Sequence, residues 1–205
     1  MAAGRKPERT RRPVHSEGRR ILVVAEGEVT EPQYVQRLSA YLRTRGVTAT
    51  VKTIGTGQDP VKVVKKCVEL RETEVARKGR EYAYDFSVCL VDVDRHAHLH
   101  DACKLARDEG ILLLVSNLKF EVWLRWHKEH KDAVLSSEEL NTVVTKLGLV
   151  DRKKLVATFP FHTVDDACAY ARKLDPEMAP GRVGPDPSSA MPILIDLMKG
   201  RELTT

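Results

Sequence analysis

The sequence of 205 residues predicts an α/β fold, in which helices cover both faces of a parallel sheet. Three observations support this fold class. Largely apolar runs stand at 21–24, 86–91 and 111–115, and strands buried on both faces have such unbroken runs. Stretches with apolar residues at helical spacing separate the runs. Gly46 and Gly110 follow two of these stretches, in the position where glycine ends a helix.

Local signals define the elements of this sheet. Strands are expected at 21–24, 47–54, 86–91 and 111–115, and helices at 32–45, from 60 onward, and at 99–109. Gly27 lets the chain turn after the first strand, and Thr30 is expected to cap the first helix. Asp59 caps the second helix, of which Pro60 is the first residue.

The second half of the chain has a different character. Helices are expected at 118–130, 136–148, 163–174 and 186–200, and the Pro- and Gly-rich stretch 175–189 is expected to be a loop. Ser136 and Glu139 form a capping box. We therefore divide the chain into three parts: a disordered basic tail (1–19), an α/β core (20–117) and a helical C-terminal part packed on the core (118–200).

The positive charge of the chain is concentrated at its start. Residues 1–20 carry seven basic and two acidic side chains, which equals the whole net charge of +5. A segment of this composition with no apolar pattern is expected to be disordered. Its Arg9, Arg11 and Arg12 are candidates for phosphate contacts with nucleic acid. The alternative is a solubilising extension or a cloning remnant.

The composition also indicates a compartment. No apolar run approaches the roughly 20 residues needed to cross a membrane, and the polar N-terminus gives no sign of a signal peptide. The four cysteines form no C-x-x-C pair and lie within helix or strand patterns. They are expected to be reduced core residues of a cytoplasmic protein that does not enter a membrane.

Acidic residues follow two strands of the predicted sheet. Glu26 comes after the first strand, and Asp92 and Asp94 come at the end of the third. Carboxyl ends of parallel strands share one edge, which is where open α/β sheets bind ligands. Because crowded carboxylates repel each other, a divalent cation is their natural partner, and their hard oxygens suit Mg²⁺ or Mn²⁺. We expect Glu26, Asp92 and Asp94 to be metal ligands.

Simpler interpretations of these acids stay open. Glu31 stands near the start of the first predicted helix, where an acid complements the helix dipole. The acids of the D-x-D sequence could be loop residues that cap neighbouring helices. The turn 55–57 precedes a helix and could hold a phosphate, although it lacks the lysine spacing of a P-loop.

Three further groups stand near these acids. Three histidines alternate along the chain, at His96, His98 and His100. Alternating histidines can bind a metal such as zinc, but these lead into a helix, where side chains two residues apart diverge. His96 is the one expected at the acidic site, as an outer group or an acid–base residue. Glu121 follows the fourth strand among apolar residues, and the adjacent Lys119 could steady a phosphate. The two tryptophans that follow are expected in the core rather than as base-stacking platforms. Arg95 and His96 are also candidates for nucleic-acid contacts.

Four stretches carry a resemblance to a known family. They are AEGEVTEPQY, LVDVDRH, SNLKFEVWL and DPSSAMPILIDLM. In order and spacing they resemble the RloB-like family, small bacterial proteins linked to restriction and phage-defence loci. The family resembles a divergent Toprim fold of the type found in overcoming-lysogenization-defect nucleases. The resemblance covers about 20–200 and implies a Toprim-like sheet in the core.

The resemblance also implies roles for single residues. Glu26 matches the Toprim glutamate and Asp92 with Asp94 its D-x-D pair, while Glu31 and Glu121 match two further acidic positions. The stretch 186–188 matches a late Asn-Pro-Ser-like element. The chain departs from the family in three places: Arg95 stands where many relatives have an acid, Leu118 where proline is common, and Asp186 where asparagine is usual. The missing acid leaves one- and two-metal sites open.

These features favour a Mg²⁺- or Mn²⁺-dependent nuclease of a phage-defence system, with RNA, including tRNA, slightly favoured over DNA. In that hypothesis Glu26, Asp92 and Asp94 bind metal, Glu31 or Glu121 completes the site or acts as base, and Lys119 contacts phosphate. Expected partners are nucleic acid and an operon-encoded defence protein such as an ATPase. The sequence is compatible with a monomer or an oligomer. The alternatives are a non-catalytic metal-nucleotide or nucleic-acid-binding module, and a receiver-like phosphate acceptor, which a lone Glu after the first strand disfavours.

Overall fold

A central sheet of five strands organises the protein. In the computed structural model, which describes residues 18–93 and 98–202, the strand order is β2-β1-β3-β4-β7. The strands are β1 (Arg20–Ala25), β2 (Thr50–Gly55), β3 (Phe86–Asp92), β4 (Leu112–Asn117) and β7 (Ser188–Ser189). The first four are parallel, and β7 pairs antiparallel with β4. The sheet is therefore mixed and mostly parallel, within the predicted α/β class.

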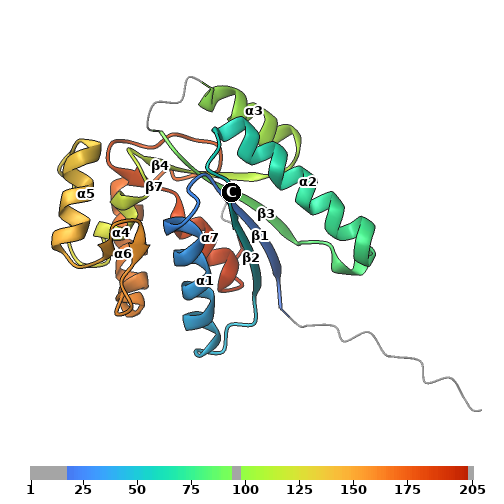
Figure 1. Cartoon of the computed structure of the whole chain (residues 1–205), viewed down its shortest axis with the longest axis horizontal. Coiled ribbons are helices and arrows are strands. Elements are labelled where there is room, and N and C mark those ends of the chain that lie inside the picture. The colour runs from blue at the N-terminus through green and yellow to red at the C-terminus, as the bar shows by residue number, and fades with distance from the viewer. Residues whose placement is uncertain (1–17, 94–97, 203–205) are drawn as a thin grey trace, which may run out of the picture.

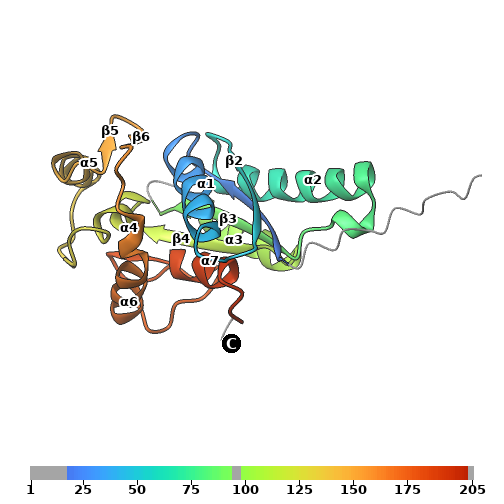
Figure 2. The ribbon, with the colours of Figure 1, turned by 90° about the horizontal axis from the view of Figure 1, so that it is seen from below.

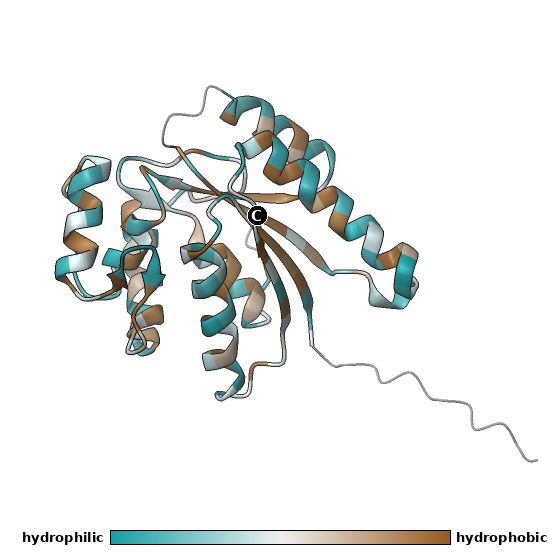
Figure 3. Cartoon of the chain, in the orientation of Figure 1, coloured by the Kyte–Doolittle hydropathy of each residue, from teal (hydrophilic) through white to brown (hydrophobic). Residues whose placement is uncertain are grey.

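Helices cover both faces of this sheet (Figure 1). On one face lie α1 (Thr30–Arg43) and α7 (Met191–Met198), and on the other α2 (Pro60–Lys78) and α3 (Leu99–Asp108). The side chains of β1 alternate between the two cores: Ile21 and Val23 pack toward α1, whereas Leu22 and Val24 pack toward α2. This two-sided burial explains why the central strands are hydrophobic along their length (Figure 3).

The C-terminal part lies beside the sheet and also adds a strand to it. It contains α4 (Glu121–Arg125), α5 (Ser137–Lys146), α6 (Val164–Leu174) and the antiparallel hairpin of β5 (Val150–Asp151) and β6 (Lys154–Leu155). Short 3₁₀ helices stand at Arg80–Tyr82 and Phe161–Thr163. Figure 2 shows α5 and the hairpin at one end of the molecule, beside α4. The C-terminal part at 118–200, which was predicted to be helical, therefore also contains a small β-hairpin.

A buried aromatic cluster joins this part to α1. The ring of Tyr34 contacts those of Phe120, Trp123, His127, Phe159 and Phe161, with centroid distances of 5.4–6.2 Å. The Tyr34 hydroxyl and His127 Nε2 are 2.9 Å apart, and burial lowers the pKa of His127 to about 4, so the ring is neutral at physiological pH. The two tryptophans are core residues, as expected.

Several boundaries differ from those predicted. Thr30 does not cap α1, because the N-cap position is Val29 and the Thr30 hydroxyl instead donates to the carbonyl of Lys153. The helix predicted at 118–130 is limited to Glu121–Arg125. The last helix begins at Met191 rather than at 186, because Ser188 and Ser189 pair with β4. Within the described ranges, no helix combines the length and apolarity that a membrane crossing requires.

Candidate functional site

The acids that follow β1 and β3 meet at one edge of the sheet. Ala25 pairs with Leu90, so Glu26 and Asp92 stand at the carboxyl ends of neighbouring parallel strands. The backbone N–H of Glu26 donates to the carbonyl of Leu90. In return, the backbone N–H of Asp92 donates to Glu26 Oε2 at 3.3 Å. This places the Glu26 carboxylate against the end of β3, at the edge where the sequence predicted it.

Glu31 is the third acid of this edge, and Gly27 makes room for it. A Cβ atom on Gly27 would lie only 2.1 Å from Oε2 of Glu31, so the carboxylate occupies the space that any other side chain would fill. The backbone N–H groups of Gly27 and Glu31 donate hydrogen bonds that favour its charged form. The Glu-Gly pair at 26–27 thus supplies one acid and the space for another.

Glu121 is the fourth acid, at the first residue of α4. Its carboxylate lies 3.6 Å from the ammonium group of Lys119. Two arginines of the C-terminal part have other partners, since Arg125 pairs with Glu129 and Arg172 with Asp196. Glu121 lines the same cavity as Glu31 and Asp92 and acts electrostatically on both, so it lies with the other acids at the sheet edge.

Mutual repulsion marks these four side chains as one electrostatic cluster. Burial is the largest cause that raises the pKa of Asp92 well above its usual range. The carboxylates of Glu31, Glu121 and Glu26 raise the pKa of Asp92 further, in that order. Burial, followed by Glu121 and Glu26, also raises the pKa of Glu31 to about 7. A cluster that resists full ionisation is suited to a cation.

Lys119 lowers the pKa of Asp92 and partly offsets this repulsion. Its ammonium group also donates to Ser137 Oγ at 3.2 Å and to Asn141 Oδ1 at 2.9 Å, both on α5. Lys119 thus connects the acid cluster to the C-terminal part. It lines the site as predicted, but it is already engaged by α5 and Glu121.

A cavity of about 700 Å³ opens in front of the acids. Glu31, Asp92 and Glu121 line it, together with residues of α5 and of the β5–β6 hairpin. Arg152 and Lys153, at the tip of the hairpin, are among the lining residues. The sequence did not predict that these two cations belong to the site. They stand in a short basic run without a recognisable motif, and only the fold brings them close to the acids.

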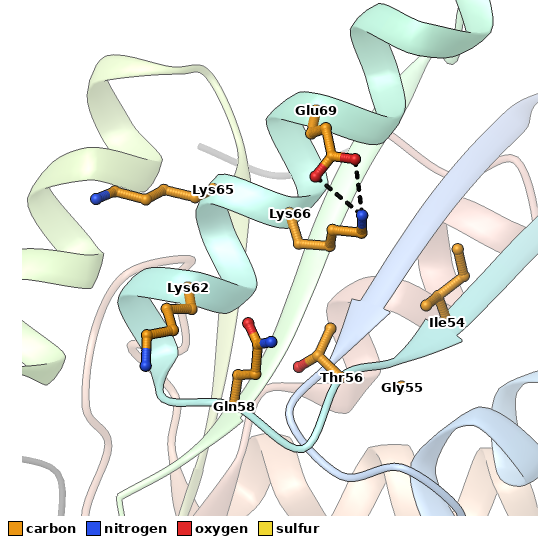
Figure 4. A pocket seen from close by; sticks show the side chains of 8 residues that line it. All are labelled: Ile54, Gly55, Thr56, Gln58, Lys62, Lys65, Lys66 and Glu69. Atoms are coloured by element: carbon orange, nitrogen blue, oxygen red, sulfur yellow. Dashed lines mark hydrogen bonds and ion pairs between the residues drawn. The ribbon is translucent and has the colours of Figure 1, made fainter.

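A second cavity, of about 460 Å³, lies where β2 leads into α2 (Figure 4). It includes the turn considered above as a phosphate cradle. Of its lysines, Lys66 donates to Glu69 at 2.7 Å and Lys62 lies 3.0 Å from Asp59. Asp59 caps α2 as predicted, by accepting from the backbone N–H of Lys62. Figure 4 shows the third lysine, Lys65, extending from α2 away from this turn. Because the other two lysines have internal partners, the acid-lined cavity is the stronger candidate site.

The chemistry of the donor set fits a hard divalent cation, since the clustered side chains offer carboxylate oxygens. In the two stretches that the structure describes, no group of three or more His, Cys, Asp or Glu side chains is arranged to hold a metal ion. Asp94, the third predicted ligand, lies outside those stretches, as do Arg95, His96, Arg9, Arg11 and Arg12. Metal binding by Glu26 and Asp92 stays a prediction.

Fold and site together define an α/β protein with a carboxylate-lined cavity at the carboxyl edge of a mostly parallel sheet. The sequence model of the family described as RloB-like protein matches residues 21–198. The chain belongs to this RloB-like family, as its motifs predicted. Comparison with curated proteins and with solved structures gave no match.

Proposed function

We propose that the protein is a Mg²⁺- or Mn²⁺-dependent nuclease that hydrolyses phosphodiester bonds, with RNA, including tRNA, favoured over DNA. The observation that carries the proposal is the gathering of four acids, Glu26, Glu31, Asp92 and Glu121, at one sheet edge. Such an acidic cluster, facing a cavity with a basic wall, suits phosphoryl-transfer chemistry. As a member of the RloB-like family, the protein is proposed to act in cytoplasmic phage defence with an operon-encoded partner such as an ATPase.

Each acid has a proposed task. Glu26 and Asp92, with Asp94, would hold the cation, which when bound neutralises developing charge and lowers the pKa of water. Glu31 has a pKa of about 7, which suits a group that exchanges a proton at physiological pH. Glu121 would complete the site or take the role of base in place of Glu31. Lys119 would moderate the repulsion among the acids.

Cleavage of labelled RNA and DNA tests this proposal. The full chain is incubated with each substrate in Mg²⁺, in Mn²⁺ and in EDTA. Cleavage is expected only with metal, and Glu26→Gln is expected to abolish it. Glu72→Gln, which neutralises an exposed acid of α2, is the matched control and is expected to retain full activity. Total RNA is then compared between cells that express the wild type and cells that express Glu26→Gln. An RNA that is cleaved only in the presence of the wild type is the substrate.

Two results would contradict the proposal: no cleavage of either nucleic acid with either metal, or equal cleavage by wild type and Glu26→Gln. A second candidate function would then apply, a non-catalytic module that binds a metal-bound nucleotide or a nucleic-acid end. Lys119 contacts both Glu121 and α5. These contacts favour the second candidate, because a ligand that binds at the acids could change the position of α5 through Lys119. Metal-dependent binding without cleavage is its expected signature.

A further inference from the structure

The acid-lined cavity has a basic wall with no assigned role. Arg152 and Lys153 form the two-residue loop of the β5–β6 hairpin, since Asp151 pairs with Lys154. Both are exposed and line the same cavity as Glu31, Asp92 and Glu121. No acidic side chain among residues 18–93 and 98–202 forms an ion pair with either of them, so both charges are available to a ligand.

One face of α1 fixes the position of this hairpin. Thr30 Oγ1 donates to the Lys153 carbonyl at 2.9 Å, and Gln33 Oε1 accepts from the Leu155 N–H at 2.9 Å. Arg37 donates to the next two carbonyls at 2.8 and 2.7 Å. Thr30, Gln33 and Arg37 are spaced three and four residues apart, as neighbours on a helix surface are. The helix that carries Glu31 therefore also holds the hairpin that carries Arg152 and Lys153.

The anchoring contacts use the hairpin backbone and leave its tip side chains free. Arg152 has φ of 55°, whereas every other positive φ in the described part of the chain belongs to a glycine. Two-residue hairpin loops favour glycine or asparagine at such positions because other side chains are strained there. A residue kept in a strained conformation beside a candidate site points to a use for its side chain.

We propose that Arg152 and Lys153 bind the phosphate backbone of the nucleic acid on which the acid cluster acts. The proposal rests on the proposed function and deepens it. A phosphodiester chain matches both walls, because its phosphates pair with guanidinium and ammonium groups while metal ions connect it to the carboxylates. The planar guanidinium of Arg152 can donate two parallel hydrogen bonds to one phosphate. The cavity of about 700 Å³, which the acids and both cations line, leaves room for this ligand.

The test compares neighbouring cations of one hairpin. Binding of fluorescein-labelled single-stranded RNA and DNA is measured by anisotropy with Mg²⁺, in the full chain carrying Glu26→Gln so that the probe stays intact. Arg152→Gln and Lys153→Gln are each expected to raise Kd on the order of tenfold, the loss of one charged hydrogen bond. Lys154→Gln is the matched control, since Lys154 is exposed on the same hairpin but does not line the cavity.

Salt dependence gives a second readout. The double variant of Arg152 and Lys153 is expected to make the slope of log Kd against log salt shallower by about 1.4, or about 0.7 for each lost phosphate contact with a single strand. Thr30→Val keeps both charges but removes one anchor of the hairpin, so it is expected to raise Kd without changing the slope. Melting temperatures of all variants are expected to stay near that of the parent.

Three results would overturn the inference: no binding of RNA or DNA by the parent, no effect of Arg152→Gln and Lys153→Gln, or an equal effect of Lys154→Gln. The inference and the proposed function fail separately. Binding through the hairpin without any cleavage by the wild type would refute hydrolysis alone. Cleavage by the wild type with unchanged kcat/KM in the hairpin variants would refute the phosphate contact alone.

Discussion

Replacing Glu31 by glutamine is expected to stabilise the protein at pH 8 in metal-free buffer. Burial and the neighbouring acids raise the pKa of Glu31 from 4.5 to about 7. A raised pKa means that the folded protein binds this proton more tightly than the unfolded chain does. The free energy of unfolding therefore falls as pH rises from about 4.5 to about 7. At pH 8 the charged carboxylate destabilises the folded state.

The size of this destabilisation follows from the rise in the pKa of Glu31. Each pKa unit corresponds to about 1.4 kcal/mol, so the rise in the pKa of Glu31 from 4.5 to about 7 corresponds to at most about 3.5 kcal/mol. The carboxylate is only partly buried, and residual solvent screening lowers this value. For a chain of this size, 1 kcal/mol changes Tm by roughly 2–4 °C. Glu31→Gln is thus expected to raise Tm at pH 8 by as much as about 10 °C.

Thermal unfolding in EDTA at pH 5 and pH 8 measures this effect. The gain is expected at pH 8 and is expected to be small at pH 5, where wild-type Glu31 is already protonated. Glu72→Gln removes the same charge from an exposed site and controls for net charge. Adding Mg²⁺ or Mn²⁺ at pH 8 is expected to raise the Tm of the wild type more than that of Glu31→Gln, since a ligand of the folded state stabilises it.

The opposite sign would refute this reasoning. If Glu31→Gln lowers Tm at pH 8, the hydrogen bonds that the carboxylate accepts from the backbone of Gly27 and Glu31 outweigh repulsion and burial. An equal change at pH 5 and pH 8 would show that ionisation of this group is not the cause. Glutamine keeps one oxygen that can accept from these N–H groups, so the comparison isolates the charge.

Two further substitutions and one truncation test the remaining acids and the N-terminal tail. Asp92→Asn is expected to abolish cleavage and to keep or raise Tm in metal-free buffer, since it removes one repelling charge; a large loss of Tm would mark Asp92 as a structural cap. Glu121→Gln is expected to lower the cleavage rate several hundredfold, on the order of 3–4 kcal/mol of barrier, without loss of Tm. A lower Tm with intact specific activity would contradict this role. Glu72→Gln, at an exposed acid of α2, is the control for the loss of one charge. Deleting 1–17 is expected to leave Tm nearly unchanged and to weaken nucleic-acid binding in low-salt gel shifts; a large fall in Tm would contradict the tail assignment.

The parts of the fold that the sequence predicted are those with local causes. The apolar runs of β1, β3 and β4 are buried on both faces, so composition alone marks them as central strands. The parallel order then brings the ends of β1 and β3 together, which is why Glu26 and Asp92 could be paired in advance. The Asp59 cap and the box of Ser136 with Glu139 are likewise local interactions.

The parts that the sequence did not predict depend on distant partners. Ser188 and Ser189 form a strand because β4 offers an open edge, and nothing in the Pro- and Gly-rich stretch around them signals pairing. Thr30 has the side chain of a helix cap, but it donates to Lys153, which lies 123 residues away. Arg152 and Lys153 form the loop between two strands of two residues each, which are too short for any periodic pattern.

The helix α1 connects the two walls of the candidate site. Its first turn carries Glu31, and the face with Thr30, Gln33 and Arg37 holds the hairpin backbone. Tyr34, one turn after Glu31, packs within the aromatic cluster that includes Trp123 of α4, the helix that Glu121 begins. A shift of α1 would therefore move the acid Glu31, the opposite cations and the contact with α4 together. The separation between Glu31 and the two cations is thus set by one packed helix rather than by independent loops, as a site that positions a phosphate between a carboxylate and cations requires.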